Sequence, residues 1–235
     1  MTGPRFSADL RATLALAAPA VRAATAALWQ PAGLRARYLA YLGAMHALIR
    51  ASVPLMELAA DRCARPAGYD PVAEPLGRYL REHAEEERGH DDWLLADIAA
   101  AGGDPGGPAA VLPSPVIAAM AGAQYYWIEH HHPVALLGYI AVLEGNAPAP
   151  GLADRLAAQT ALPAAAFRTL RDHAALDTGH LADLDGLLDR LPLSAARRTA
   201  VRVSALHTVR ELARLFRDLA TDRPTVPSLV PGGPT

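Results

Sequence analysis

The sequence predicts an all-α fold built as one helical bundle. Alanine, leucine and arginine, which favour helices, are abundant, whereas only 6% of the residues are aromatic and β-branched residues are too sparse for a large sheet. Proline and glycine separate segments that are long enough for helices of several turns. Because 51% of the 235 residues are apolar, the chain can bury one large core.

Three helices are expected in the first half of the chain. The first covers residues 7–29 and the second covers residues 33–62. The third begins at Asp70 and Pro71, because aspartate can cap a helix and proline fits its first turn. It continues to Ala101, where two glycines end it.

The remaining expected helices follow a loop over residues 102–115. Their ends are marked by proline, serine and glycine, and they cover residues 115–130, 133–145, 151–160, 163–191 and 195–221. No repeat or linker divides the chain. We therefore expect residues 1–221 to form a single domain, a bundle of about seven helices, followed by a tail rich in proline and glycine over residues 222–235.

Charge and cysteine content exclude several classes of protein. The 22 basic and 24 acidic residues nearly balance, so the surface has no bias toward phosphate backbones or anionic lipids. Cys63 is the only cysteine, which rules out an internal disulfide and a thiolate metal cluster. Arg5 and Asp9 precede any apolar stretch, unlike a signal peptide, and no charge-free apolar run of roughly 18 residues occurs. We expect a cytoplasmic protein that binds neither nucleic acid nor membrane.

The third expected helix carries a group of carboxylates and imidazoles. Glu86, Glu87 and His90 share one of its faces, because residues three and four apart are neighbours on a helix. His83 lies two turns before His90. A carboxylate and an imidazole can thus converge on one metal ion. A solvated acidic face that pairs with nearby arginines would produce the same pattern.

The helix expected over residues 163–191 carries the pattern His173-x3-Asp177-x2-His180, which places three potential metal ligands along one stripe. Core histidines with other partners, or helix caps, are the structural alternative. Glu144 ends an apolar segment, where a buried carboxylate must be paired, protonated or bound to a metal. A carboxylate exposed at a helix end is the alternative there.

Together these residues are typical of a dinuclear metal site in a helical bundle. Two helices each present a carboxylate-x-x-His unit, Glu87 with His90 and Asp177 with His180, and Glu144 comes from a third helix. Oxygen and imidazole ligands without thiolate favour iron or manganese over zinc.

These motifs resemble those of the haem-oxygenase-like, non-haem dimetal oxidases, which are also described as iron-containing redox enzymes. The resemblance spans roughly residues 35–220, and it rests on His83-x-x-Glu86-Glu87-x-Gly89-His90, His132-Pro133-Val-Ala-Leu-Leu-Gly138-Tyr139, Leu143-Glu144-Gly145 and His173-x3-Asp177-x2-His180. It implies a haem-oxygenase-like bundle of about seven helices with a metal site in its interior.

The resemblance also implies a set of metal ligands. The residues that match the ligand positions of the family are His90, Glu144, His173, Asp177 and His180. Family members place a further glutamate at differing distances before the first histidine, so we expect Glu87 to be this ligand, with Glu86 and His83 as the next candidates. Some relatives take another glutamate from the preceding helix, where Glu57 is the candidate.

From the resemblance we expect a non-haem di-iron oxidase or oxygenase that uses O2 to oxidise a small organic substrate of the amino-acid, amine or fatty-acid type in specialised metabolism. The expected cofactor is two Fe(II) ions, with manganese as the alternative. Two other classes stay open: a metal-independent enzyme of the same fold, thiaminase-II-like or quinone-forming, and a ferritin-like metal-binding bundle. Exposed apolar helix faces would be compatible with a homodimer.

Overall fold

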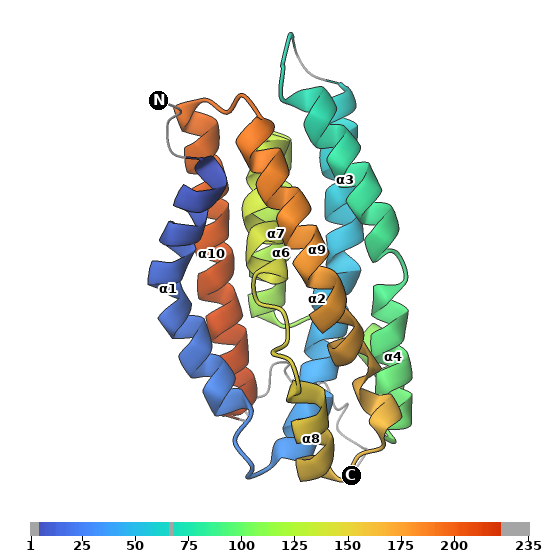
Figure 1. The fold of residues 1–235 in the computed structure, drawn as a ribbon. Helices are drawn as coiled ribbons and strands as arrows, with labels where there is room; N and C mark the ends of the chain where they lie inside the picture. The colour runs from blue at the N-terminus through green and yellow to red at the C-terminus, as the bar shows by residue number, and fades with distance from the viewer. Residues whose placement is uncertain (1–4, 66–67, 222–235) are drawn as a thin grey trace, which may run out of the picture.

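The computed structural model describes residues 5–65 and 68–221 as an elongated bundle of helices (Figure 1). The bundle contains α1 (Phe6–Leu28), α2 (Leu34–Ala64), α3 (Ala73–Glu87), α4 (His90–Ala100), α6 (Pro115–His130), α7 (Leu136–Glu144), α8 (Leu152–Thr160), α9 (Arg168–Arg190) and α10 (Ala195–Ala220). A short helix, α5 (Gly107–Ala110), and two 3-10 turns, η1 (Pro133–Ala135) and η2 (Ala164–Phe167), join them. No strand occurs in the described ranges, so the all-α prediction is confirmed, and the expected tail lies outside them.

The bundle is organised around α2 and α10. The helix α10 packs against α1 and α7, and α2 packs against α3, α4 and α6. In Figure 1, α1 and α10 lie on one side of the bundle and α3 and α4 on the other, with α7 and α9 between them. Because α9 contacts α3, α4 and α7, these four helices can bring polar side chains together in the interior.

A close contact at Gly138 fixes α7 against α10. A Cβ atom at this position would lie 2.1 Å from the carbonyl oxygen of Val201 and 2.6 Å from the amide nitrogen of Ala205. Only glycine allows two backbones to approach this closely. The contact thereby sets the position of Glu144, the last residue of α7.

The helix α2 is long and apolar enough to cross a membrane, judged by length and composition alone, with a mean hydropathy of 1.3 in its most apolar window. The core helix of a bundle meets the same criteria. In this structure Leu42, Leu48 and Leu55 of α2 are buried. Packing inside the bundle accounts for these residues, and 33% of the most apolar window is buried.

The expected third helix is broken, and this prediction of continuity is wrong. The helix α3 ends at Glu87 and α4 begins at His90. Between them Arg88 is extended, and Gly89 adopts a left-handed conformation with a φ of 85°. Glycine accepts this conformation without the steric cost that a side chain would impose.

Other differences from the expected helices are smaller. Asp70 does not cap α3; its carboxylate accepts a hydrogen bond from the amide of Val72 at 3.0 Å, and α3 begins at Ala73. The helices expected over residues 133–145 and 163–191 both begin as 3-10 turns, and α5 lies within the expected loop. All other helix ends agree with the prediction to within two residues.

Candidate metal centre

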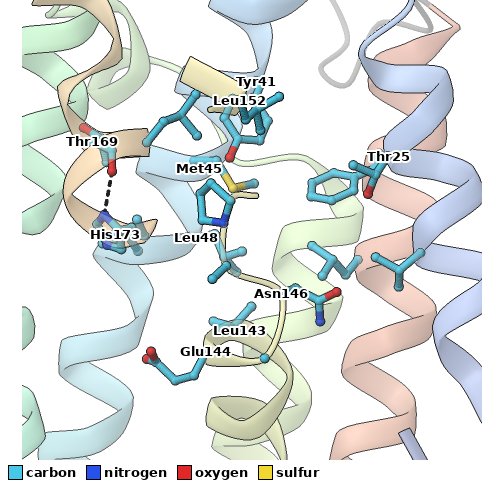
Figure 2. Close-up of a pocket in the computed structure, with 18 of the residues that line it drawn as sticks. Thr25, Tyr41, Met45, Leu48, Leu143, Glu144, Asn146, Leu152, Thr169 and His173 are labelled. Atoms are coloured by element: carbon cyan, nitrogen blue, oxygen red, sulfur yellow. Dashed lines mark hydrogen bonds between the residues drawn. The ribbon is translucent and has the colours of Figure 1, made fainter. Parts of the chain in front are cut away.

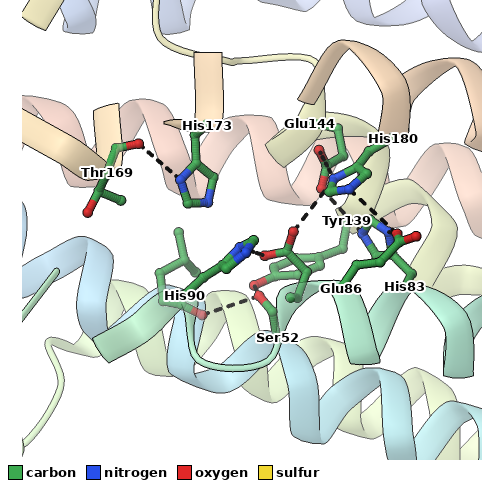
Figure 3. Close-up of polar contacts among 11 residues, drawn as sticks. Ser52, His83, Glu86, His90, Tyr139, Glu144, Thr169, His173 and His180 are labelled. Atoms are coloured by element: carbon green, nitrogen blue, oxygen red, sulfur yellow. Dashed lines mark hydrogen bonds and ion pairs between the residues drawn. The ribbon is translucent and has the colours of Figure 1, made fainter. Parts of the chain in front are cut away.

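Four helices bring six of the predicted or candidate ligands into two clusters that share Glu87. The first cluster contains His83 and Glu87 of α3, Glu144 of α7 and His180 of α9, and the second contains Glu87, His90 of α4 and His173 of α9. Within each cluster one potential ligand atom from every residue lies within 4.8 Å of the others. Figure 3 shows the side chains that it labels in these clusters pointing toward one another from facing helices: His83, His90, Glu144, His173 and His180.

In the first cluster Glu144 lies between two histidines. Its Oε1 lies 3.3 Å from Nε2 of His83, and its Oε2 lies 3.3 Å from Nδ1 of His180. The same nitrogen of His180 lies 3.6 Å from Oε1 of Glu87. All four side chains are largely buried. The alternative of a solvent-exposed Glu144 at a helix end is therefore excluded.

In the second cluster Glu87 Oε2 lies 3.0 Å from Nδ1 of His90. His173 donates from Nδ1 to the carbonyl oxygen of Thr169 at 3.1 Å, which leaves Nε2 as its unprotonated nitrogen when the ring is neutral. Burial lowers the pKa of His173 and so favours that neutral form. Asp177 belongs to α9, and its side chain lies outside the described part of the structure.

Two further candidates lie at or beyond the edge of the clusters. Glu86 is 60% exposed, with its Oε2 3.5 Å from Nε2 of His180 and 3.7 Å from Nδ1 of His83. Glu57 is exposed and pairs with Arg88 at 2.9 Å. The structure therefore places Glu86 beside the first cluster and does not bring Glu57 to either one.

Opposite charges dominate the electrostatics of the clusters. Burial alone would raise the pKa of Glu144, but its contacts with His180 and His83 lower this pKa to about 2. The carboxylate of Glu144 raises the pKa of His180 to about 9, against the effect of burial. Burial also opposes ionisation of Glu87, yet His90 holds the pKa of its carboxyl below the usual range. Each carboxylate is thus ionised and surrounded by imidazoles.

The arrangement of these side chains suits a bound metal ion better than it suits hydrogen bonding among the side chains alone. Nδ1 of His180 is buried, and no residue in the described ranges gives it a hydrogen bond of good geometry, although two carboxylates lie near it. Imidazole nitrogens and carboxylate oxygens are a donor set that iron and manganese accept. The residues present therefore fit metal binding at this place.

Further residues, which the sequence analysis did not single out, support the clusters. Asp97 of α4 is fully buried, and its Oδ2 accepts a hydrogen bond from the amide of Thr169 at 3.0 Å. Since the carbonyl of Thr169 in turn holds His173, Asp97 positions this imidazole indirectly. Tyr79 stacks on His83, with ring centroids 5.5 Å apart. The position of Asp97 within the otherwise apolar stretch over residues 93–100 was the available signal.

The motif residue His132 has a structural role. Its Nε2 donates to Asp70 Oδ2 at 2.8 Å, and its Nδ1 accepts from the amide of Val134 at 3.0 Å. The ring therefore caps η1 and ties it to the residues that precede α3. Arg197 of α10 joins this group through Oδ1 of Asp70, at 2.8 Å.

A cavity of about 650 Å³ reaches the clusters from one side (Figure 2). Its walls are mostly apolar, and its polar lining includes His83, Glu87, Glu144 and His173. A second pocket of about 500 Å³ lies against the first cluster, and its polar lining residues are Arg78, Tyr79, Glu82, His83, Glu86, His180, Asp183 and Arg190. The clusters can thus be reached through an apolar cavity and through a polar pocket.

Two crystal structures have the same fold. A domain of unknown function with a heme oxygenase-like fold, from Shewanella denitrificans, is similar over 94% of this chain and 94% of its own, with 16% identity and a TM-score of 0.76. A TenA homolog from Pseudomonas syringae pv. tomato is similar over 93% of each chain, with 14% identity and a TM-score of 0.70. These similarities confirm the haem-oxygenase-like fold expected from the sequence.

The sequence comparisons identify the family. None of the curated proteins matches the chain significantly. Residues 84–212, more than half of the chain, match the iron-containing redox enzymes. This segment includes the shared Glu87 and most of the two clusters, although it begins just after His83. The chain therefore belongs to the family of iron-containing redox enzymes.

Proposed function

We propose that this protein is a non-haem dimetal oxidase that binds two Fe(II) ions and uses O2 to oxidise a small organic substrate. The observation that carries the proposal is the position of Glu87, which belongs to both ligand clusters. A carboxylate has two oxygens and can serve two ions, as in the carboxylate sites of other helical bundles. Manganese is the alternative metal, because it accepts the same donor types.

Each cluster would supply ligands for one ion. His83, Glu144 and His180 would hold the first, and His90 and His173 would hold the second, with Glu87 between them. We propose Asp177 as a further ligand of the second ion on the basis of the sequence motif. When bound by imidazole and carboxylate ligands with vacant positions, iron supplies the capacity to activate O2.

The protein itself orients the ligands and excludes water. Thr169 fixes the tautomer of His173 so that Nε2 is the unprotonated nitrogen. The apolar walls of the cavity allow an organic molecule to lie beside Glu87 and Glu144 with little competing water. These features support oxidation of a substrate that is enclosed next to the ions.

A metal-independent enzyme is the second candidate, because the fold is shared with a TenA homolog. If such an enzyme relied on a thiol nucleophile, it would have to use Cys63, the only cysteine. Burial raises the pKa of the Cys63 thiol to about 12, and Cys63 does not line the cavity that reaches the clusters. A protonated, buried thiol is a poor nucleophile, so this candidate has less support.

Anaerobic reconstitution followed by oxygen exposure tests the proposal. The purified protein is stripped with a chelator, loaded with Fe(II), and separated from unbound iron before the metal is counted. We expect two iron ions per chain and rapid oxygen consumption that depends on the bound iron. Oxygen consumption equal to that of the stripped protein would contradict an oxidase. Loading of many ions per chain, without any dependence of oxygen uptake on organic substrates, would instead favour a ferritin-like function.

The enzyme would act in the cytoplasm on O2 and a small molecule of the amino-acid, amine or fatty-acid type, in specialised metabolism, without nucleic acid or membrane partners. A homodimer would be compatible with exposed apolar side chains such as Leu206 and Val203 on α10. Size-exclusion chromatography with light scattering measures the oligomeric state directly.

A further inference from the structure

The large cavity has two ends of different chemistry. At the inner end are His83 and Glu87, which are only 4% and 9% exposed. The outer end is lined by exposed residues of α1, of α8 and of the segment 145–149. Figure 2 shows Thr25 of α1 across the cavity from Glu144 and His173. A ligand in the cavity would therefore have one end beside the clusters and the other near solvent.

The outer end carries two arginines that have no acidic partner. Arg22 lies one turn before Thr25 on α1, and Arg155 lies one turn after Leu152 on α8. Both line the cavity and are exposed, and no ion pair or hydrogen bond joins their side chains to any residue in the described ranges. The carboxylates that line the cavity are both at the inner end. The outer end is consequently positive.

Most of the remaining cavity wall is apolar and aromatic. It includes Trp29, Tyr41, Met45, Leu48 and Phe216. The rings of Trp29 and Tyr41 meet edge to face, with centroids 5.0 Å apart. The buried indole nitrogen of Trp29 has no hydrogen-bond acceptor among the described residues. A ligand body must therefore be apolar here, and any polar atom that it places near Trp29 must be an acceptor.

We propose that the cavity binds an organic anion with an apolar body, with its anionic group against Arg22 and Arg155 and its apolar end toward Glu144 and His173. This inference narrows the substrate class of the proposed function. It rests on that function in one respect, namely that the apolar end, which lies beside the clusters, is the end that is oxidised. A volume of about 650 Å³ is enough for one such molecule. Uncompensated guanidinium groups attract an anion and disfavour an amine of the same shape.

Three isosteric probes test this charge preference: 4-phenylbutyrate, 4-phenylbutanol and 4-phenylbutylamine. Binding of each to the metal-free full-length protein is measured by isothermal titration calorimetry. We expect the acid to bind about tenfold more tightly than the amine, with the alcohol between them. Equal affinities for the acid and the amine would overturn the proposal, and so would the failure of all three to bind at millimolar concentration.

Replacement of the arginines locates the anion. Arg22→Ala and Arg155→Ala should each weaken binding of the acid about five-fold and leave binding of the alcohol unchanged. Arg50→Ala is the matched control, because Arg50 is exposed on α2 and does not line the cavity. The double variant Arg22→Glu/Arg155→Glu should prefer the amine. An unchanged affinity for the acid in the double variant would overturn the proposal.

Metal counting on the same samples separates this inference from the proposed function. If the charge preference depends on the arginines but no iron is bound after reconstitution, the proposed function fails and the binding site stands. If two ions bind but Arg22 and Arg155 have no effect on the acid, the function stands and this inference fails. An acid affinity that rises strongly with bound iron and ignores both arginines would place the anion at the inner end.

Discussion

Glu87 and His90 form a 3.0 Å hydrogen bond across a break in the backbone, between the last residue of α3 and the first residue of α4. The break consists of the extended Arg88 and the left-handed Gly89. It allows Glu87 to face His180 while the ring of His90 lies against His173, with centroids 5.1 Å apart. The two halves of the candidate centre thus meet at a helix break.

Replacement of Gly89 by alanine should destabilise the protein by about 1–2 kcal/mol, because the left-handed backbone penalises a side chain. No atom lies within 4 Å of the position of the new Cβ, so the effect would arise from backbone strain. Gly122→Ala in the exposed middle of α6 is the control and should stabilise by about 0.5–1 kcal/mol. Urea unfolding measures both free energies, and equal effects of the two substitutions would contradict this explanation.

Removal of Asp97 should lower the metal affinity of the second cluster, although Asp97 is not itself one of the candidate ligands. Asp97→Ala deletes the acceptor that holds the amide of Thr169, and loss of such a supporting contact typically reduces metal affinity about 10- to 100-fold. Asp97→Asn keeps an acceptor oxygen and should retain most of the affinity. Exposed Asp92 on the same helix provides the control, Asp92→Ala. An anaerobic Fe(II) titration measures the affinities. Equal Fe(II) affinities of Asp97→Ala and Asp92→Ala would contradict this role.

Acid should destabilise the fold through Asp70 and His132, which lie away from the clusters. Burial would raise the pKa of Asp70, but hydrogen bonds from His132, Val72 and Arg197 lower it, and burial lowers the pKa of His132. A group with a lowered pKa in the folded state adds stability above its unfolded pKa and loses it as the pH falls through its folded pKa. The contribution of His132 to the free energy of unfolding is therefore lost as the pH falls below about 6.5, and the contribution of Asp70 is lost below about pH 4.

Urea unfolding between neutral and acidic pH measures this dependence. Asp70→Asn should lower the free energy of unfolding at neutral pH and flatten the part of its decline that lies below about pH 4. Asp61→Asn is the control, because Asp61 forms only an exposed ion pair with Arg65. If Asp70→Asn left the decline as steep as in the unmodified protein, the stability would depend on other groups.

The fold, and most of the residues that meet in the two clusters, could be predicted from the sequence because both depend on local patterns. Helix formers, prolines and glycines mark the helix ends, and the spacing of Glu87, His90, His173 and His180 follows helical periodicity. The geometric reason given for Glu87 and His90 was nevertheless wrong. They meet across the break at Gly89 and not on one continuous helix.

Features that depend on contacts between distant helices could not be derived from the sequence. His83 ranked below Glu87 as a candidate, yet its Nε2 lies 3.3 Å from Glu144, a residue on another helix. Glu57 pairs instead with Arg88, which follows α3. The roles of Asp97 and of the cavity arginines likewise depend on how α4, α9, α1 and α8 pack. No periodicity within one helix contains that information.

The most direct test of the account compares Glu87→Ala with Glu86→Ala. These neighbouring carboxylates differ in position: Glu87 is shared by both clusters, whereas Glu86 is 60% exposed at their edge. After anaerobic loading with Fe(II), we expect two iron ions per chain in the unmodified protein and in Glu86→Ala, and fewer than one in Glu87→Ala, with circular dichroism showing that all three are helical. Two ions retained by Glu87→Ala, or none bound by the unmodified protein, would contradict a shared dimetal centre.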